Sequence, residues 1–204
     1  MSYFPFFVDL AGLSGLVIGG GQVARRKVEK LMPFGPKLTV VAPEFCPELE
    51  ARTDVTLLRR PVRAEDLEGA HFVIAAAVPE VNARAAELCR KKRIPVNVVD
   101  DPAQCSFLFP SLVQRGKLTV GISTAGASPT AAIYLKERVN DLLPDNFDRL
   151  LDWLESLRPE LKAATPEEAV RSRVFSRLFH GAMALGRPLT EEELRGIIRK
   201  ECGE

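Results

Sequence analysis

Three successive glycines, Gly19-Gly20-Gly21, constrain the fold of this chain more than any other feature. They follow a short apolar run that begins at Leu16, and they precede a segment with helical spacing of apolar residues. From Gly19 to Ala24 the pattern is G-x-G-x-x-A. In such a turn the first glycine permits the tight bend, the second lets the backbone approach a pyrophosphate, and the small third residue lets the helix pack on the strand. We therefore predict a dinucleotide-binding βαβ unit, because a plain turn does not need the backbone entropy that three glycines cost.

The first half of the chain alternates short apolar runs with helical patterns. This alternation is typical of a parallel sheet with crossover helices. The predicted strands are Leu16–Gly19, Leu38–Ala42, Val55–Leu58, Phe72–Ala76 and Val96–Val99, and the predicted helices between them are Gln22–Phe34 and Val81–Arg93.

The pattern changes after Cys105. Two short strands, Phe107–Phe109 and Leu118–Ile122, are predicted on either side of a turn at Arg115-Gly116-Lys117. A helix is predicted from Ser128-Pro129 to about Leu143, since serine at the N-cap and proline in the first turn are typical start signals. The fold class is thus α/β: a Rossmann-like parallel-sheet domain at 1–112, a small segment at 113–145 and a C-terminal helical domain at 146–204. The predicted helices of that last domain are Phe147–Leu161, Pro166–Leu185 and Thr190–Lys200.

The charges nearly cancel, with 28 Lys and Arg against 27 Asp and Glu. The chain lacks the basic excess that favours nucleic acids or anionic membranes, so no nucleic-acid or membrane partner is expected. No apolar run reaches the length of a membrane span, and the N-terminus lacks the features of a signal peptide, so we expect a cytosolic protein. The 4 cysteines and 2 histidines are scattered without ligand spacing, so no metal site is expected.

The end of the second predicted strand leaves the choice of dinucleotide open. The acidic residue that commonly holds the ribose hydroxyls is absent from Val41-Ala42-Pro43, and Glu44 comes slightly late. The basic residues Arg25, Arg26 and Lys27 follow the turn on the first helix, and we interpret them as solvated charges of the helix face. The residues alone therefore do not separate NAD from NADP.

A carboxylate follows the last predicted strand of the sheet. Asp100 stands at the carboxyl end of Val96–Val99, where ligands bind in open α/β sheets. Its neighbour Asp101 precedes a proline and is interpreted as a turn residue. Asn97 either orients Asp100 or hydrogen-bonds a neighbouring loop.

A second polar stretch, Ser123-Thr124-Ala125-Gly126-Ala127-Ser128-Pro129, follows a strand and opens a helix. Hydroxyls, free amides and a helix N-terminus together make an anion-binding concavity. Ser128 by itself is typical of an N-cap, and Thr124 is the more informative ligand candidate. The stretch predicts contacts with an acidic substrate.

Together these stretches resemble the precorrin-2 dehydrogenases, which also form the N-terminal module of siroheme synthases. The resemblance runs through Tyr3–Phe7, the glycine turn, Asn97–Asp101, Ser106–Ser111 and Ser123–Pro129. It implies NAD-dependent oxidation of precorrin-2, a tetrapyrrole with eight carboxylates, to sirohydrochlorin on the way to siroheme. It also implies a homodimer that exchanges its 113–145 segments around an active site between subunits. Fe²⁺ is a further candidate substrate, because some family members insert it afterwards; no methyltransferase domain is expected beyond Glu204.

The resemblance assigns roles to particular residues. Asp100 is the expected catalytic base for the proton that leaves with the hydride. Asn82 is expected near the cofactor, although capping its helix is an equal alternative. The expected cofactor-binding residues are Gly19, Gly21, Gln22, Val23, Ala24, Val41, Ala76 and Asn82, and the expected substrate-binding residues are Asn97, Ser123, Thr124, Gly126 and Ser128.

Two functions of other classes compete with this hypothesis. A non-catalytic nucleotide-sensing module predicts a nucleotide-dependent conformational change without turnover, and it leaves Asp100 and the Ser123–Pro129 stretch unexplained. A tetrapyrrole chelatase or metal-delivery protein with a vestigial nucleotide site predicts metal insertion without any need for NAD. A dehydrogenase of another small substrate is disfavoured, because no His or Lys acid/base pair accompanies the glycine turn.

Overall fold

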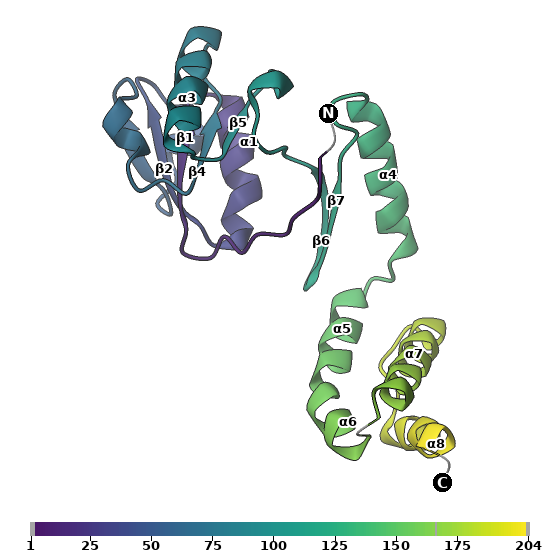
Figure 1. Ribbon diagram of the computed structural model, residues 1–204. Helices are drawn as coiled ribbons and strands as arrows, with labels where there is room; N and C mark the ends of the chain where they lie inside the picture. Colours follow the sequence, from purple (N-terminus) through teal and green to yellow (C-terminus); the bar gives the residue numbers. More distant parts are fainter. Residues whose placement is uncertain (1–2, 166, 203–204) are drawn as a thin grey trace. The chain divides into compact units, whose positions relative to one another are not determined.

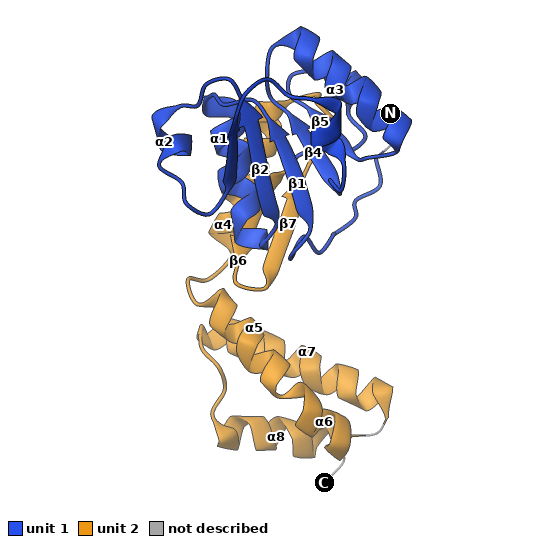
Figure 2. Cartoon of the chain, turned by 90° about the vertical axis from the view of Figure 1, so that its left-hand side faces the viewer, with its two compact units in different colours: residues 1–109 blue, residues 110–204 orange. Residues whose placement is uncertain are grey.

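The chain folds into two compact units, Met1–Phe109 and Pro110–Glu204, which Figure 2 shows in blue and orange. The structure, a computed structural model, describes residues 3–165 and 167–202. The division falls close to the predicted boundary at residue 112. A separate dimerisation segment that ends at residue 145 stays a prediction.

Five parallel strands form the sheet of the first unit in the order β3-β2-β1-β4-β5. The order reverses at β1, whose neighbours are β2 and β4, and ligands of open α/β sheets bind at the carboxyl ends of the strands beside such a point. Each strand overlaps a predicted one, so the prediction of a Rossmann-like α/β fold is confirmed. The strands are β1 (Ser14–Ile18), β2 (Lys37–Ala42), β3 (Thr56–Arg59), β4 (Phe72–Ala75) and β5 (Val96–Val98) (Figure 1).

Helices cover both faces of this sheet. Side chains alternate between the faces of a strand, so Leu16 and Ile18 enter one core and Val17 enters the other. Helix α3 (Pro79–Lys92) covers the first face and α1 (Gln22–Leu31) covers the second (Figure 1). The remaining elements are short: α2 (Pro47–Glu50) and the 3₁₀ turns Met32–Phe34, Ala64–Leu67 and Pro102–Gln104.

The outer edge of β5 is closed by side chains. The Ser106 hydroxyl accepts a hydrogen bond from the Val96 N–H (2.7 Å), and the Ser106 N–H donates to the Val96 carbonyl (2.9 Å). The Cys105 thiol accepts from the Val98 N–H (3.1 Å) and donates to the Val98 carbonyl (3.2 Å). These bonds satisfy backbone groups that a sixth strand would otherwise pair.

The second unit begins with an antiparallel hairpin, β6 (Ser111–Arg115) and β7 (Leu118–Ile122), joined at Gly116. The prediction of a strand at Phe107–Phe109 is wrong. Both phenylalanines pack instead against the α1 face of the first unit's sheet, because an isolated apolar run carries no signal that separates a strand from a packed loop. Helix α4 (Pro129–Leu142) starts and ends close to its predicted positions and packs on β6.

Four further helices surround a separate core that includes the fully buried Leu150, Leu161 and Leu178. The helical segment predicted over Phe147–Leu161 is confirmed, and a break at Leu157 divides it into α5 and α6. The predicted start at Pro166 lies outside the described residues. The helices are α5 (Phe147–Ser156), α6 (Arg158–Ala164), α7 (Glu168–Leu185) and α8 (Glu191–Cys202), and none of the described helices is long and apolar enough to cross a membrane.

Candidate coenzyme and substrate sites

The glycine turn between β1 and α1 has the geometry that a bound pyrophosphate requires. Gly19 adopts φ 123°, in the left-handed region that favours glycine, and a Cβ there would overlap the Ala76 carbonyl oxygen. A Cβ at Gly20 would overlap the Glu44 carbonyl oxygen, while the Gly20 carbonyl accepts a hydrogen bond from the Cys46 N–H (2.7 Å). Gly20 therefore holds the loop after β2 against the turn, a role that the motif pattern did not reveal.

Gly21 stands apart from the other two glycines. Its φ of −87° is open to any residue, and a Cβ there meets no protein atom within 4 Å. Gly21 is also the N-cap of α1, with no side-chain cap, and the first turn of that helix contains no acidic residue. No protein carboxylate or capping side chain therefore takes up the free N–H groups and the positive end of the helix dipole, so both can bind a phosphate.

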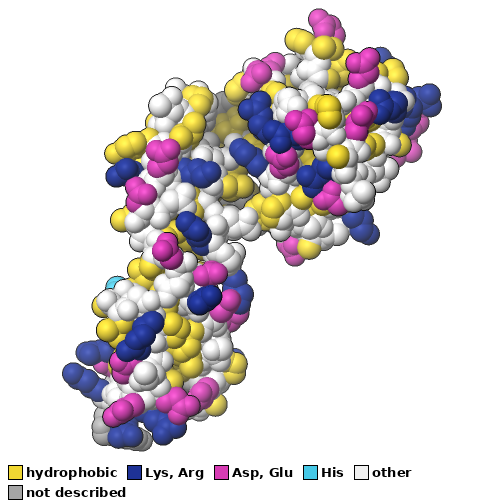
Figure 3. Space-filling model, turned by 180° about the vertical axis from the view of Figure 1, so that it is seen from behind, with side chains coloured by type: hydrophobic (Ala, Val, Ile, Leu, Met, Phe, Trp, Pro, Cys, Tyr) yellow, Lys and Arg dark blue, Asp and Glu magenta, His cyan; other side chains and the backbone are white. Residues whose placement is uncertain are grey.

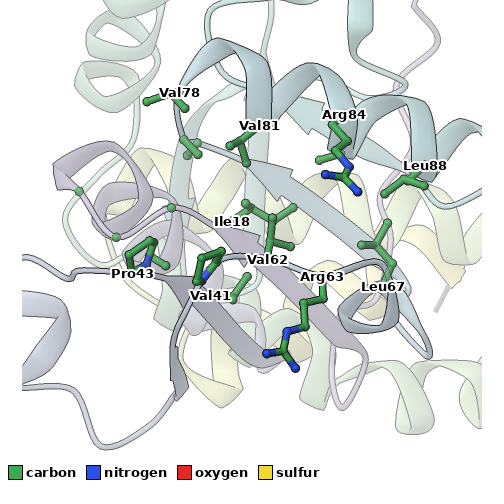
Figure 4. Close-up of a pocket in the computed structure, with 18 of the residues that line it drawn as sticks. Ile18, Val41, Pro43, Val62, Arg63, Leu67, Val78, Val81, Arg84 and Leu88 are labelled. Atoms are coloured by element: carbon green, nitrogen blue, oxygen red, sulfur yellow. The ribbon is translucent and has the colours of Figure 1, made fainter.

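A cavity of about 570 Å³ opens beside this turn (Figure 4). Its wall comes from the ends of β1, β2 and β4, the loop after β3, and one side of α3. Most of the lining is apolar, which suits a flat aromatic ring. The lining residues are Ile18, Gly19, Gly20, Gly21, Val41, Ala42, Pro43, Glu44, Pro61, Val62, Arg63, Ala64, Leu67, Ala76, Ala77, Val78, Val81, Arg84, Ala85 and Leu88.

Two exposed arginines supply the positive charge of this cavity. Arg84 comes from α3 and Arg63 from the loop after β3, as Figure 4 shows, and Glu44 is the only acidic residue in the lining. Guanidinium groups bind phosphates and stack on aromatic rings, so both suit an anionic dinucleotide. Sequence reasoning missed them, because nothing in their local pattern points to the glycine turn.

The expected cofactor residues fall into two groups. Four of them, Gly19, Gly21, Val41 and Ala76, line the cavity. The other four lie outside its lining: the Gln22 amide donates to Glu48 (3.0 Å), Val23 is half-buried and Ala24 packs in the core. The Asn82 side chain accepts from the Ala77 N–H (2.9 Å) and donates to its carbonyl (3.1 Å), which shapes the loop after β4.

Asp100 occupies a strained position at the carboxyl end of β5. Its φ is 61°, one of three positive values among the described non-glycine residues, and its side chain is exposed. Asp and Asn tolerate this left-handed conformation better than other side chains do. Strained backbone of this kind clusters at functional sites, since surrounding structure must hold it in place. The exposed carboxylate is thus presented at the edge where ligands of this fold bind.

Asn97 is buried three residues before Asp100, and both ends of its side-chain amide are hydrogen-bonded. Its Nδ2 donates to the Phe107 carbonyl (3.1 Å) and to the Cys105 thiol (3.5 Å). Its Oδ1 accepts from the Lys27 ammonium at 3.5 Å. Of the two roles left open for Asn97, hydrogen bonding to a neighbouring loop is the one seen.

The Ser123–Ser128 turn belongs to the second unit and forms a compact hydrogen-bonded structure. The Thr124 hydroxyl accepts from the Ser128 N–H (3.1 Å) and donates to its carbonyl (3.0 Å). The Ser128 hydroxyl caps α4 by accepting from the Ala131 N–H (3.1 Å), as an N-cap serine is predicted to do. The Ser123 hydroxyl accepts from the Ala125 N–H (3.2 Å), and Gly126 adopts φ 87°.

Two thiols of the first unit, those of Cys89 and Cys105, carry no sign of nucleophilic activation. Burial raises the pKa of Cys89 to about 11 and also raises the pKa of Cys105. Within residues 3–165 and 167–202, no group of three or more His, Cys, Asp and Glu side chains is placed to hold a metal ion.

Residues 6–111 match the family model described as putative NAD(P)-binding. The chain belongs to this NAD(P)-binding family. The matched residues contain the glycine turn, the cavity beside it and Asp100. An NAD-type cofactor is therefore the coenzyme of this chain.

Relatives of this NAD(P)-binding chain are siroheme synthases, which confirms the resemblance seen in the sequence. Siroheme synthase of Thioalkalivibrio sulfidiphilus is 38% identical over 200 residues, which cover 96% of this chain and 40% of the relative. Siroheme synthase 3 of Aeromonas hydrophila is 39% identical over 193 residues, which cover 93% of this chain and 41% of the relative. The chain thus spans about two fifths of the length of these relatives.

The fold of this NAD(P)-binding chain is shared with a solved structure titled "SirC, precorrin-2 dehydrogenase". The two structures match with a TM-score of 0.71 at 22% sequence identity. The match covers 99% of this chain and 100% of the other. The likeness confirms the α/β fold over the whole length of the chain.

One ion pair in this NAD(P)-binding unit fixes a wall of the cavity, and its removal gives a testable prediction. The Arg60 guanidinium donates to both oxygens of Asp66 (2.5 and 2.8 Å), and the Arg63 N–H donates to Asp66 as well (2.7 Å). The Arg60 hydrogen bond, foremost, holds the pKa of the Asp66 carboxyl below its usual range. We expect D66N to lower the free energy of unfolding by about 1–3 kcal/mol at pH 7, since three donors lose their charged acceptor.

The pH dependence of this effect has a fixed sign. Because the folded pKa of Asp66 lies below the unfolded value of about 3.9, its stabilisation is complete above that value and is lost as the pH falls toward the folded pKa. Denaturant titrations between pH 7 and pH 3 should therefore show wild type and D66N converging at the acidic end. D54N is the control, because Asp54 pairs with Arg52 at the surface and such pairs contribute little. An equal loss in both variants would contradict the prediction.

Proposed function

We propose that this protein oxidises precorrin-2 to sirohydrochlorin with NAD as the hydride acceptor, in siroheme biosynthesis. The observation that carries the proposal is the juxtaposition, in one α/β unit, of a pyrophosphate turn and a strained, exposed Asp100 at the carboxyl end of β5. The relatives support the choice of substrate, because siroheme synthases at 34–39% identity align with 90% or more of this chain.

The chemistry divides between the coenzyme and the chain. An NAD held at the glycine turn would supply the hydride acceptor, and oxidation of the tetrapyrrole also releases one proton. The Asp100 carboxylate acts as the general base for that proton, held toward solvent by its left-handed backbone. Gly21 and the free N–H groups of α1 hold the pyrophosphate, and the apolar wall of the cavity excludes water from the ring it receives.

The acidic side chains of the substrate need donors, and the Ser123–Ser128 turn is our candidate for some of them. Ser123, Thr124 and Ser128 use their hydroxyls within the turn, and the N–H groups of Ala125, Ala127 and Ser128 have partners there, so the Gly126 N–H is the donor that remains for a carboxylate. A carboxylate that accepts from this N–H forms a charge-assisted hydrogen bond. A homodimer is part of the same proposal, supported by exposed apolar side chains of α4, namely Ile133, Tyr134, Leu135 and Leu142.

The deciding experiment is an anaerobic absorbance time course of precorrin-2 with the purified protein, with and without NAD and without metal. We expect NADH and the sirohydrochlorin spectrum to appear together, and only when NAD is present. NADP in place of NAD tests the choice of coenzyme, and sedimentation velocity tests the dimer.

Other outcomes separate the competing functions. Binding of NAD without any conversion would overturn the dehydrogenase and favour a nucleotide sensor. Metal insertion into sirohydrochlorin, with no NAD-dependent oxidation of precorrin-2, would favour a chelatase. Fe²⁺ added after complete oxidation tests whether iron is a second substrate of the same protein.

A further inference from the structure

Lys27 differs from the other cations of α1. Arg25 pairs with Glu29 (2.5 Å), Arg26 donates to the Gln22 carbonyl, and Lys30 is exposed. The interpretation of Lys27 as a solvated charge is wrong, because its side chain is half-buried and contacts Asn97 of β5 and the Phe109 ring.

The ammonium of Lys27 is held by weak partners. Its Nζ lies 3.5 Å from the Asn97 Oδ1 on β5 and 4.0 Å from the centroid of the Phe109 ring. Within the described part of the chain it forms no ion pair with Asp or Glu. An ammonium has three N–H donors, so at least one of them has no strong acceptor.

The neighbouring charges make it unfavourable to bury the Lys27 ammonium without an anion beside it. Burial lowers the pKa of Lys27, as do the neighbouring Lys30 and Arg26, whereas Cys105 and Asp100 act in the opposite direction. A cation that loses hydration without gaining a counter-ion destabilises the fold. An incoming carboxylate would compensate that loss.

Lys27 is also well placed along the sheet. It contacts Asn97, which lies three residues before Asp100 in the sequence. Asn97 has both amide donors in use within its own loop, so Lys27 is the residue that still has donors to offer a ligand. On the face seen in Figure 3, basic and acidic side chains are interspersed, so a polyanionic substrate depends there on individual cations.

We propose that Lys27 binds a peripheral carboxylate of the tetrapyrrole and so orients the substrate beside Asp100. This inference rests on the proposed oxidation of precorrin-2 and adds a specificity-determining residue to it. The ammonium forms a charge-assisted hydrogen bond with the carboxylate, while Asn97 and Phe109 keep the lysine side chain in position.

The test combines a binding measurement with steady-state kinetics. Uroporphyrin, a porphyrin with eight carboxylates, serves as the equilibrium probe in a fluorescence titration that needs no turnover. We expect K27M and K27Q to raise the Kd for uroporphyrin and the KM for precorrin-2 by about 10- to 100-fold. K27R should stay close to wild type, because it keeps the charge. NAD affinity should be retained in all three variants, and the thermal midpoint should not fall.

Lys30 provides the matched control, since K30M removes an exposed ammonium one turn along the same helix. Uroporphyrin binding that is equal in K27M, K30M and wild type would overturn the inference. A loss of porphyrin binding that comes only with lost NAD affinity and a lowered midpoint in both K27M and K27Q would overturn it too. If wild type binds uroporphyrin through Lys27 but does not oxidise precorrin-2, the proposed function fails and the carboxylate anchor stands.

Discussion

Asparagine in place of Asp100 is expected to lower kcat for precorrin-2 oxidation by about 100- to 10,000-fold, the usual contribution of a positioned general base. Asparagine matches the shape of aspartate and tolerates the left-handed backbone at this position, so D100N removes the charge without disturbing the turn. The KM for NAD and the thermal midpoint should remain those of wild type. Stopped-flow absorbance of NADH formation under anaerobic conditions measures the effect.

Asp101 offers a control for D100N in the adjacent position. Its carboxylate accepts a hydrogen bond from the Gln104 side chain (2.5 Å), so it shapes the 3₁₀ turn that follows. D101N should therefore change kcat far less than D100N does. If D100N keeps most of the wild-type rate, Asp100 is not the base, and the proton leaves by another route.

Alanine in place of Gly21 should weaken NAD binding by about 10- to 100-fold and leave the fold intact, because its added methyl group meets only the bound pyrophosphate. The backbone of Gly21 suits alanine, and no protein atom lies within 4 Å of the new Cβ. Isothermal titration calorimetry with NAD, paired with a thermal melt, measures both quantities.

The neighbouring glycine provides the contrast. A Cβ at Gly20 would overlap the Glu44 carbonyl, so G20A should lower stability by about 1–3 kcal/mol as well as weaken NAD binding. NAD affinity unchanged in G21A would mean that the coenzyme does not approach this turn closely. A midpoint lowered as much in G21A as in G20A would show that Gly21, too, is needed by the fold itself.

Most of the sheet could be predicted from the sequence, because each buried strand is a short apolar run bounded by turn residues. The strand predictions fail where tertiary packing, and not the local sequence pattern, decides the structure. Phe107–Phe109 has the composition of a strand but packs as a loop on α1. The break between α5 and α6 had a local signal that was overlooked: Pro159 lies in the first turn of α6, where proline is well tolerated.

Some residues of the candidate site could also be predicted from the sequence, and others could not. The glycine turn and Asp100 were predictable, since a motif and a strand end mark them. Lys27, Arg63 and Arg84 were not, because their importance arises from contacts made only in the folded chain. Lys27 meets Asn97 across 70 residues of sequence, a pairing that helical spacing cannot reveal.

The hydrogen bonds that the Cys105 thiol makes at the outer edge of β5 bear on how the purified protein should be stored. An open sheet edge is a template for strands of other chains, and it promotes aggregation. Here the Cys105 thiol accepts a hydrogen bond from the Val98 N–H and donates one to the Val98 carbonyl at that edge. Alkylation or oxidation of this sulfur would leave the Val98 N–H and carbonyl unpaired at the sheet edge. The shelf life of a purified preparation should accordingly depend on reductant, even though cysteine has no part in the proposed chemistry.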